Sequence, residues 1–129
     1  VTAGKTAPVI KTTGEVTKIQ VVDATKLDSE VSDVTAQNLI VVGGPCANTV
    51  AAELLGNPAE CAEGFEEGKA MVKLFEHAGK VSMLVAGYSA TDTQAASRAV
   101  ATGAVADIDG DEAMITVTDI EDYTVLGAK

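Results

Sequence analysis

The chain has 129 residues, of which 47% are apolar, and a formal net charge of −10 from nineteen acidic and nine basic residues. This length suits one domain with a real hydrophobic core, so residues 1–129 are expected to form a single domain. The acidic balance, with Arg98 as the one arginine, argues against binding to nucleic acid or to an anionic membrane. No apolar run approaches the roughly 18 residues that read as a membrane span, so membrane insertion is not expected.

Residues 1–8 are expected to be a tail or an exchanged strand. Residues 9–12 and 15–22 have β-type composition, with a turn signal at Gly14 between them. Residues 23–37 predict either one short helix or a long connection. The sequence NLIVV at 38–42, followed by two glycines, predicts a strand buried on both faces, as in a parallel sheet covered by helices.

After this strand, Pro45 is predicted to open a helix that stops at Gly56, with Asn48 or Thr49 as competing N-caps. A second helix is predicted over residues 63–78, because five residues make an apolar stripe at helical spacing: Phe65, Gly68, Met71, Val72 and Phe75. Gly79 would end it.

Residues 81–86 predict another apolar strand. A third helix follows, with a buried side made mainly of alanines and a cap at Ser89, Thr91 or Asp92. Residues 113–118 and 123–126 predict two more strands. This order predicts an α/β chain, namely a small three-layer fold with a short parallel sheet core flanked by helices and antiparallel edge strands.

The two cysteines, Cys46 and Cys61, do not have zinc-site spacing. A disulfide is the preferred interpretation, and it would favour an exported protein. Two buried free thiols, or a redox or catalytic role, are the alternatives.

Gly43 and Gly44 stand where a strand meets a helix, a position that can bind phosphate. The segment VVGGPCANT lacks both common phosphate-binding glycine motifs, and Pro45 removes one backbone N–H. A tight turn that packs a helix on the sheet is therefore preferred to a phosphate site.

The sequence GYSAT at 87–91 partly resembles the turn that carries a hydrolase serine, which would make Ser89 a nucleophile. The only histidine, His77, precedes Ser89, whereas the hydrolase order places histidine last. Helix capping by Ser89 explains the same residues. His77 is expected at a helix end, and its pairing with Cys46 or Cys61 lacks the basic cluster that would lower a thiol pKa.

The acidic turn at residues 107–112 is the one candidate metal site. Asp107, Asp109 and Asp111 alternate around a glycine and could present several oxygens to calcium. The run is too short for an EF-hand. A plain solvated loop is the alternative, and no other cofactor is expected.

Several motifs in one order carry a resemblance to a known family. They are the strand ending in VGGP at 42–45, the NP pair with Cys61 after it, GKAMVKLF at 68–75 and the strand ending in AGY at 86–88. Over residues 38–101 the chain resembles surface-layer (S-layer) proteins of methanogenic and Thermococcus-like archaea.

The resemblance implies a secreted, non-enzymatic envelope protein that self-assembles into an extracellular lattice or filament. Its partners would be further copies of itself, and strand addition by its β-rich ends is one route to such an assembly. The sequence shows no leader peptide, so the chain is expected to be processed or cut from something longer. The competing interpretation is a small-ligand-binding or hydrolytic α/β domain that uses the strand ends near Gly43, Gly44 and Ser89.

Overall fold

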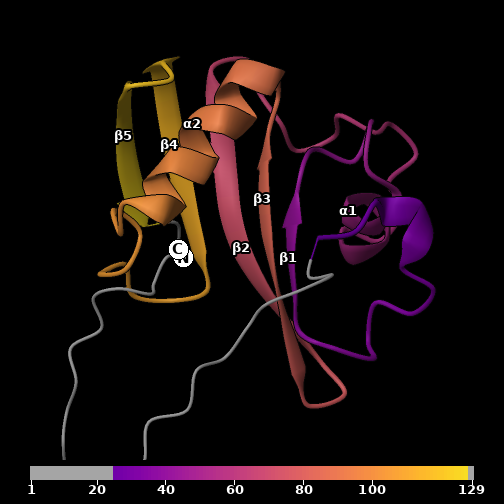
Figure 1. Ribbon diagram of the computed structural model, residues 1–129. Helices are drawn as coiled ribbons and strands as arrows, with labels where there is room; N and C mark the ends of the chain where they lie inside the picture. Colours follow the sequence, from indigo (N-terminus) through magenta and orange to yellow (C-terminus); the bar gives the residue numbers. More distant parts are fainter. Residues whose placement is uncertain (1–24, 128–129) are drawn as a thin grey trace, which may run out of the picture.

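A computed structural model describes residues 25–127, which fold around one five-stranded mixed sheet with the strand order β1-β3-β2-β4-β5 (Figure 1). The strands are β1 (Leu39–Val42), β2 (Lys69–His77), β3 (Lys80–Gly87), β4 (Glu112–Asp119) and β5 (Asp122–Gly127). The helices are the 3-10 turn η2 (Asp28–Glu30), α1 (Thr49–Leu54) and α2 (Ala90–Ala101). The tail predicted at residues 1–8 and the strands predicted at 9–12 and 15–22 lie outside the described residues.

The sheet is mostly antiparallel. β2 is antiparallel to both of its neighbours, and β4 is antiparallel to β5. β1 runs parallel to β3, with Leu39 opposite Ser82 and Val42 opposite Val85. Within residues 25–127 the parallel pairing therefore lies at one edge of the sheet, and the prediction of a parallel centre is wrong.

β2 occupies most of the segment predicted as a helix over residues 63–78, and that prediction is wrong. As a central strand, β2 buries side chains on both faces, so its sequence shows no simple alternation of apolar and polar residues. Val72 belongs to the core on one face and Met71 to the core on the other. Ladders to β3 and β4 on both sides satisfy its backbone and outweigh the helical spacing of its apolar residues.

A two-residue turn joins β2 to β3. Ala78 and Gly79 both have positive φ, at 51° and 78°, which is the type I′ geometry that matches the twist of a hairpin. His77 pairs with Lys80 across this turn. His77 therefore ends a strand, and its expected place at a helix end is wrong.

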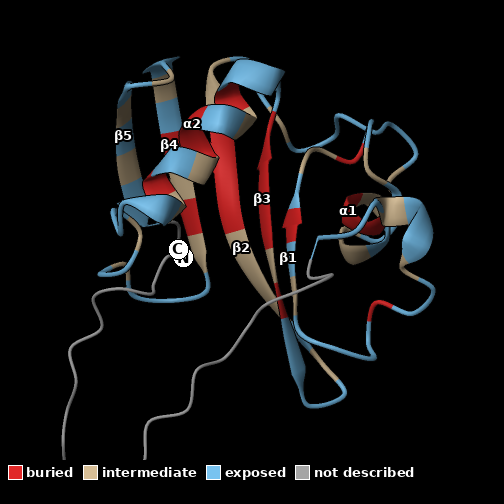
Figure 2. Cartoon of the chain, viewed as in Figure 1, coloured by how far each residue is buried: buried red, intermediate tan, exposed pale blue. Residues whose placement is uncertain are grey.

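Two apolar clusters lie on opposite faces of the sheet (Figure 2). Under α2, Ala96 and Ala99 pack with Val72, Val85 and Ile115. The small alanines, which are fully buried, let the helix lie close to the strands, as the sequence predicted.

The opposite cluster joins α1 to β1, β2 and β3. It contains Val41, Val50, Met71, Leu84 and Ala86. α1 has only six residues and lies beside β1 in Figure 1. The chain is α/β in the broad sense, with one helix layered on the sheet and a short one near its edge. This arrangement does not establish the predicted three layers.

The apolar strand β1 is not buried on both faces as predicted. Val41 is buried, but Ile40 is 71% exposed and Val42 is 52% exposed. α2 lies over β2, β3 and β4 and leaves β1 uncovered on that face. An apolar run of four residues cannot distinguish an edge strand from a central one, because both have the same composition.

Both helices are capped where the sequence placed polar residues. Asn48 caps α1, and its side-chain oxygen accepts from the backbone N–H groups of Val50 and Ala51. α1 therefore begins at Thr49, four residues later than the predicted start at Pro45. Ser89 caps α2.

Candidate functional site

The glycines, the cysteines and Ser89 singled out in the sequence meet at one end of the sheet. They line a groove of about 390 Å³ where β1 and β3 end, between the GGPC loop (residues 43–46), the segment around Cys61 and the start of α2. This is the crevice in which parallel strands usually hold a ligand.

The glycines here allow close packing of backbone on backbone. A Cβ on Gly44 would lie 3.2 Å from the carbonyl oxygen of Gly87. A Cβ on Gly87 would lie 2.5 Å from Cβ of Asp92 and 2.6 Å from the backbone nitrogen of Thr93. The first turn of α2 thus rests directly on the end of β3, in space that only glycine leaves free. Gly43, with φ of 126°, supplies the turn itself.

The polar groups at the start of α2 are engaged in capping. Ser89 Oγ accepts from the backbone N–H of Asp92, and the Asp92 carboxylate accepts from the backbone N–H of Ser89. Thr93 Oγ1 accepts from the backbone N–H of Gly87 and donates to the carbonyl of Ser89. Ser89 is therefore a helix cap in this structure, which is the simpler of its two interpretations.

His77 lies at the opposite end of the β2–β3 hairpin from this groove. The register pairs Ala70 with Gly87 at the groove end and His77 with Lys80 at the turn. A Ser89–His77 pair would need the two side chains within hydrogen-bond reach. Ser89 and His77 are separated by nearly the full length of β2, so the structure does not bring their side chains together.

His77 instead contacts Ser82, a residue that the sequence did not single out. His77 Nε2 lies 3.2 Å from Ser82 Oγ, and Ser82 is fully buried. Hydrogen bonds from Thr35 lower the pKa of Asp33, and the nearby charge of His77 adds a smaller lowering. The signal for Ser82 was a single hydroxyl inside the apolar run VSMLVA, which needs a partner once the run is buried.

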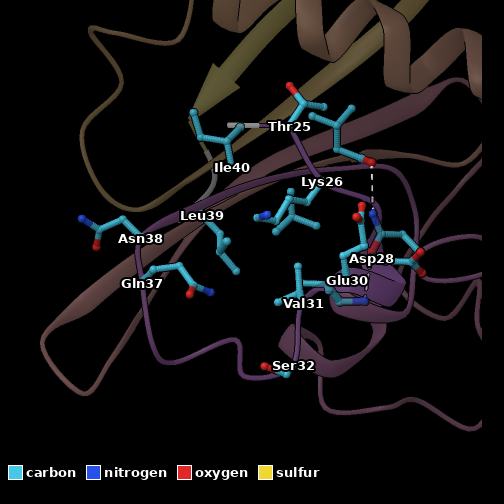
Figure 3. Close-up of a pocket in the computed structure, with 14 residues that line it drawn as sticks. Thr25, Lys26, Asp28, Glu30, Val31, Ser32, Gln37, Asn38, Leu39 and Ile40 are labelled. Carbon is cyan, nitrogen blue, oxygen red and sulfur yellow. Dashed lines mark hydrogen bonds between the residues drawn. The ribbon is translucent and has the colours of Figure 1, made fainter. Parts of the chain in front are cut away.

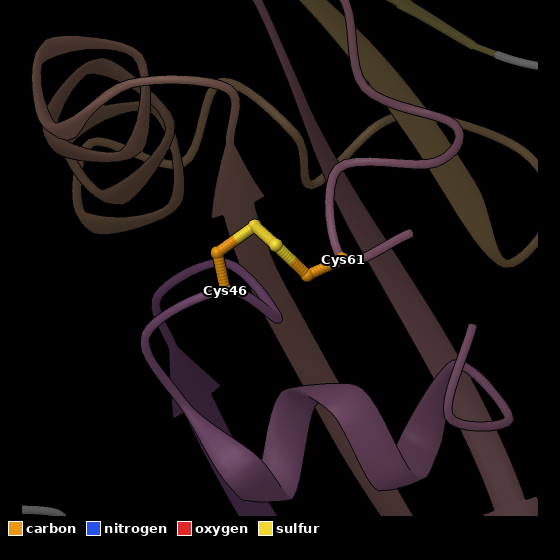
Figure 4. The surroundings of a disulfide bond; sticks show 2 residues. All are labelled: Cys46 and Cys61. Atoms are coloured by element: carbon orange, nitrogen blue, oxygen red, sulfur yellow. A yellow bond between two sulfur atoms is a disulfide. The ribbon is translucent and has the colours of Figure 1, made fainter. Parts of the chain in front are cut away.

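Cys46 and Cys61 form a disulfide, with their Cα atoms 4.9 Å apart (Figure 4). The bond joins the GGPC loop to the segment that leads from α1 toward β2, across a sequence separation of 15. Because both sulfurs are bonded, neither is available as the thiolate that a catalytic pairing with His77 would need. The disulfide and the glycine contacts together fix the loop that follows β1 against the start of α2.

The acidic turn lies between α2 and β4, far along the chain from the groove. Gly110 has φ of 101°, and the backbone carbonyl of Asp111 accepts from the N–H of Leu74 on β2. Within residues 25–127 no three His, Cys, Asp or Glu side chains come together in a way that could hold a metal ion. Calcium binding by Asp107, Asp109 and Asp111 stays a prediction.

Comparison with known proteins gives one family. Residues 2–103 match the S-layer like family, outer domain. The chain therefore belongs to the S-layer like family. No curated protein and no solved structure matches the chain.

Family membership indicates a structural role in the cell envelope and a location at the cell surface. It does not favour the ligand-binding or hydrolytic interpretation. Among the described helices, none is long and apolar enough to cross a bilayer. The match ends at residue 103, so β4 and β5 lie outside the matched residues.

Proposed function

We propose that the chain is a secreted structural module of an archaeal surface layer, and that copies of it assemble into an extracellular lattice or filament. The observation that carries this proposal is the family match over residues 2–103, which covers most of the chain. The module works by shape and contact, with no chemical step.

Two features of the molecule support an extracellular setting. Disulfides persist in oxidising surroundings, and Cys46–Cys61 holds the loop after β1 in place. The net charge of −10 keeps an exposed protein soluble and suits surroundings rich in salt or divalent cations.

Electron microscopy of the purified chain tests this proposal. Negatively stained samples at high protein concentration should contain sheets or fibres. Sedimentation of the same samples should show species much larger than one chain. A chain that stays monomeric at high concentration, with its disulfide intact, contradicts self-assembly.

The proposal also includes calcium binding by the acidic turn, which a separate experiment tests. If Asp107, Asp109 and Asp111 bind calcium, assemblies should disperse in a chelator and re-form when calcium is returned. The triple variant Asp107→Asn, Asp109→Asn, Asp111→Asn should then no longer respond to calcium. Assemblies indifferent to the chelator would remove calcium from the proposal and leave the structural role standing.

A further inference from the structure

The outer edge of β1 is one of the two open edges of the described sheet. β1 pairs with β3 on one side, and the backbone of Gly43 just beyond it donates to the carbonyl of Val85 on β3. Backbone groups alternate in direction along a strand, so Val41 and Gly43 face β3 while Ile40 and Val42 face away from it. Along this edge the Val42 carbonyl accepts from Asn48 Nδ2. Among residues 25–127, neither the β1–β3 ladder nor a loop contact gives a partner to the Ile40 N–H and carbonyl or to the Val42 N–H.

The side chains on this strand also leave apolar surface open. Ile40 and Val42 lie on the face that α2 covers elsewhere, and both are mostly exposed. A groove of about 790 Å³ runs along β1, and Figure 3 shows Leu39 and Ile40 in it together with Thr25 and Lys26. An apolar strand edge of this kind is a template for one more strand.

The sequence just before Thr25 has the composition of a strand. Residues 15–22, EVTKIQVV, have β-type composition, and Thr17, Ile19 and Val21 would share one face of an extended strand. These three residues are β-branched, like Ile40 and Val42. This segment lies within residues 2–103, which match the family.

The connection between segment and edge is short. Only Asp23 and Ala24 separate Val22 from Thr25, and Thr25 already lines the groove beside β1. So short a tether gives the segment an effective concentration on the order of millimolar or more at the edge. A second copy would reach that concentration only in a dense assembly.

We propose that residues 15–22 of the same chain add a sixth strand to the open edge of β1. The backbone groups of Ile40 and Val42 would bond to this strand, which would also cover part of their apolar side chains. This proposal does not depend on the envelope role.

Amide hydrogen exchange of the full 129-residue chain, followed by NMR, tests the proposal residue by residue. The N–H groups of Ile40 and Val42 should exchange at least about tenfold more slowly than in an unstructured peptide. The N–H groups of Val41 and Gly43, which face β3, report in the same spectrum whether β1 itself is intact.

A double variant identifies the donor strand. Ile19→Pro with Gln20→Pro removes two successive N–H groups at the middle of the segment, one of which faces β1 in every register that pairs these residues with the strand. Protection at Ile40 and Val42 should then fall to that of a peptide, while Val41 and Gly43 stay protected. Thr2→Pro with Ala3→Pro is the matched control and should change none of the four amides.

Three results would overturn the proposal. The first is free exchange of Ile40 and Val42 in the unaltered chain. The second is protection that survives Ile19→Pro with Gln20→Pro. The third is protection that disappears on dilution, which would assign the added strand to a second copy.

Discussion

Replacing both cysteines, Cys46→Ala with Cys61→Ala, should lower the free energy of unfolding by about 3 kcal/mol. The disulfide joins residues 15 apart in the sequence. In the chain-entropy model, closing a loop of about that size lowers the entropy of the unfolded chain by roughly 10 cal/mol/K, which is about 3 kcal/mol at 25 °C. Small domains have total stabilities of about 5–15 kcal/mol, so this is a large share of the whole.

Urea unfolding followed by far-UV circular dichroism measures the effect, since the chain has no tryptophan to serve as a fluorescent probe. With a slope of about 2 kcal/mol per molar urea, the midpoint should fall by about 1.5 M. Wild-type protein reduced with dithiothreitol is the control, because it loses the bond and keeps both sulfurs. Reduced protein and the variant should unfold together, well below the oxidised protein. A midpoint for either that equals that of oxidised protein would refute the reasoning.

The remaining predictions concern single contacts. Gly87→Ala should destabilise the protein by about 1–3 kcal/mol in urea unfolding, because the new Cβ would lie 2.5 Å from a side-chain atom of α2. Gly44→Ala should destabilise it less in the same assay, because its Cβ would lie 3.2 Å from the nearest atom. Asn48→Ala should cost about 1 kcal/mol through loss of the α1 cap, and a loss near zero in urea unfolding would contradict that role. Hydrogen bonds from Thr49 lower the pKa of Asp28, and those from Thr35 lower that of Asp33. Both carboxylates therefore contribute stability that is present above the unfolded-state value of 3.8 and is lost as pH falls through the folded-state pKa values. NMR titration should give midpoints below 3.8 for both, and Asp28→Asn should weaken the acid dependence; midpoints at 3.8 or above would contradict it.

Local signals in the sequence located several elements correctly. The alanine face identified α2, Ser89 was one of three candidate caps for it, and the apolar run before Gly87 identified β3. Asn48 was one of two candidate caps for α1. These features depend on residues near one another in the chain, so composition and spacing suffice to find them.

The errors arose where distant pairing decides the structure. β2 is apolar on both faces because it is central in the sheet, and that position depends on β4, some forty residues later. β1 has the composition of a central strand, but in the described sheet it pairs only with β3, and α2 does not extend over its face. The contact of His77 with Ser82 follows from the hairpin turn at Ala78 and Gly79, which the sequence suggested only as a helix end.

The groove was predicted in part, because some of its contacts also depend on residues that are distant in the sequence. The sequence placed Gly43, Gly44 and Ser89 together at the strand ends and considered the two cysteines separately, and all of them line one groove. It did not show that Gly87 admits the first turn of α2, because that contact depends on how the helix turns back over its own strand.

The disulfide also limits how far the chain can be stretched. An extended chain spans about 3.5 Å per residue, so the loop closed by Cys46 and Cys61 withholds roughly 50 Å of contour length from any pull applied at the two ends of the chain. Under such tension β1 and β2 stay tethered through one covalent bond, and that segment can lengthen only after the bond is reduced.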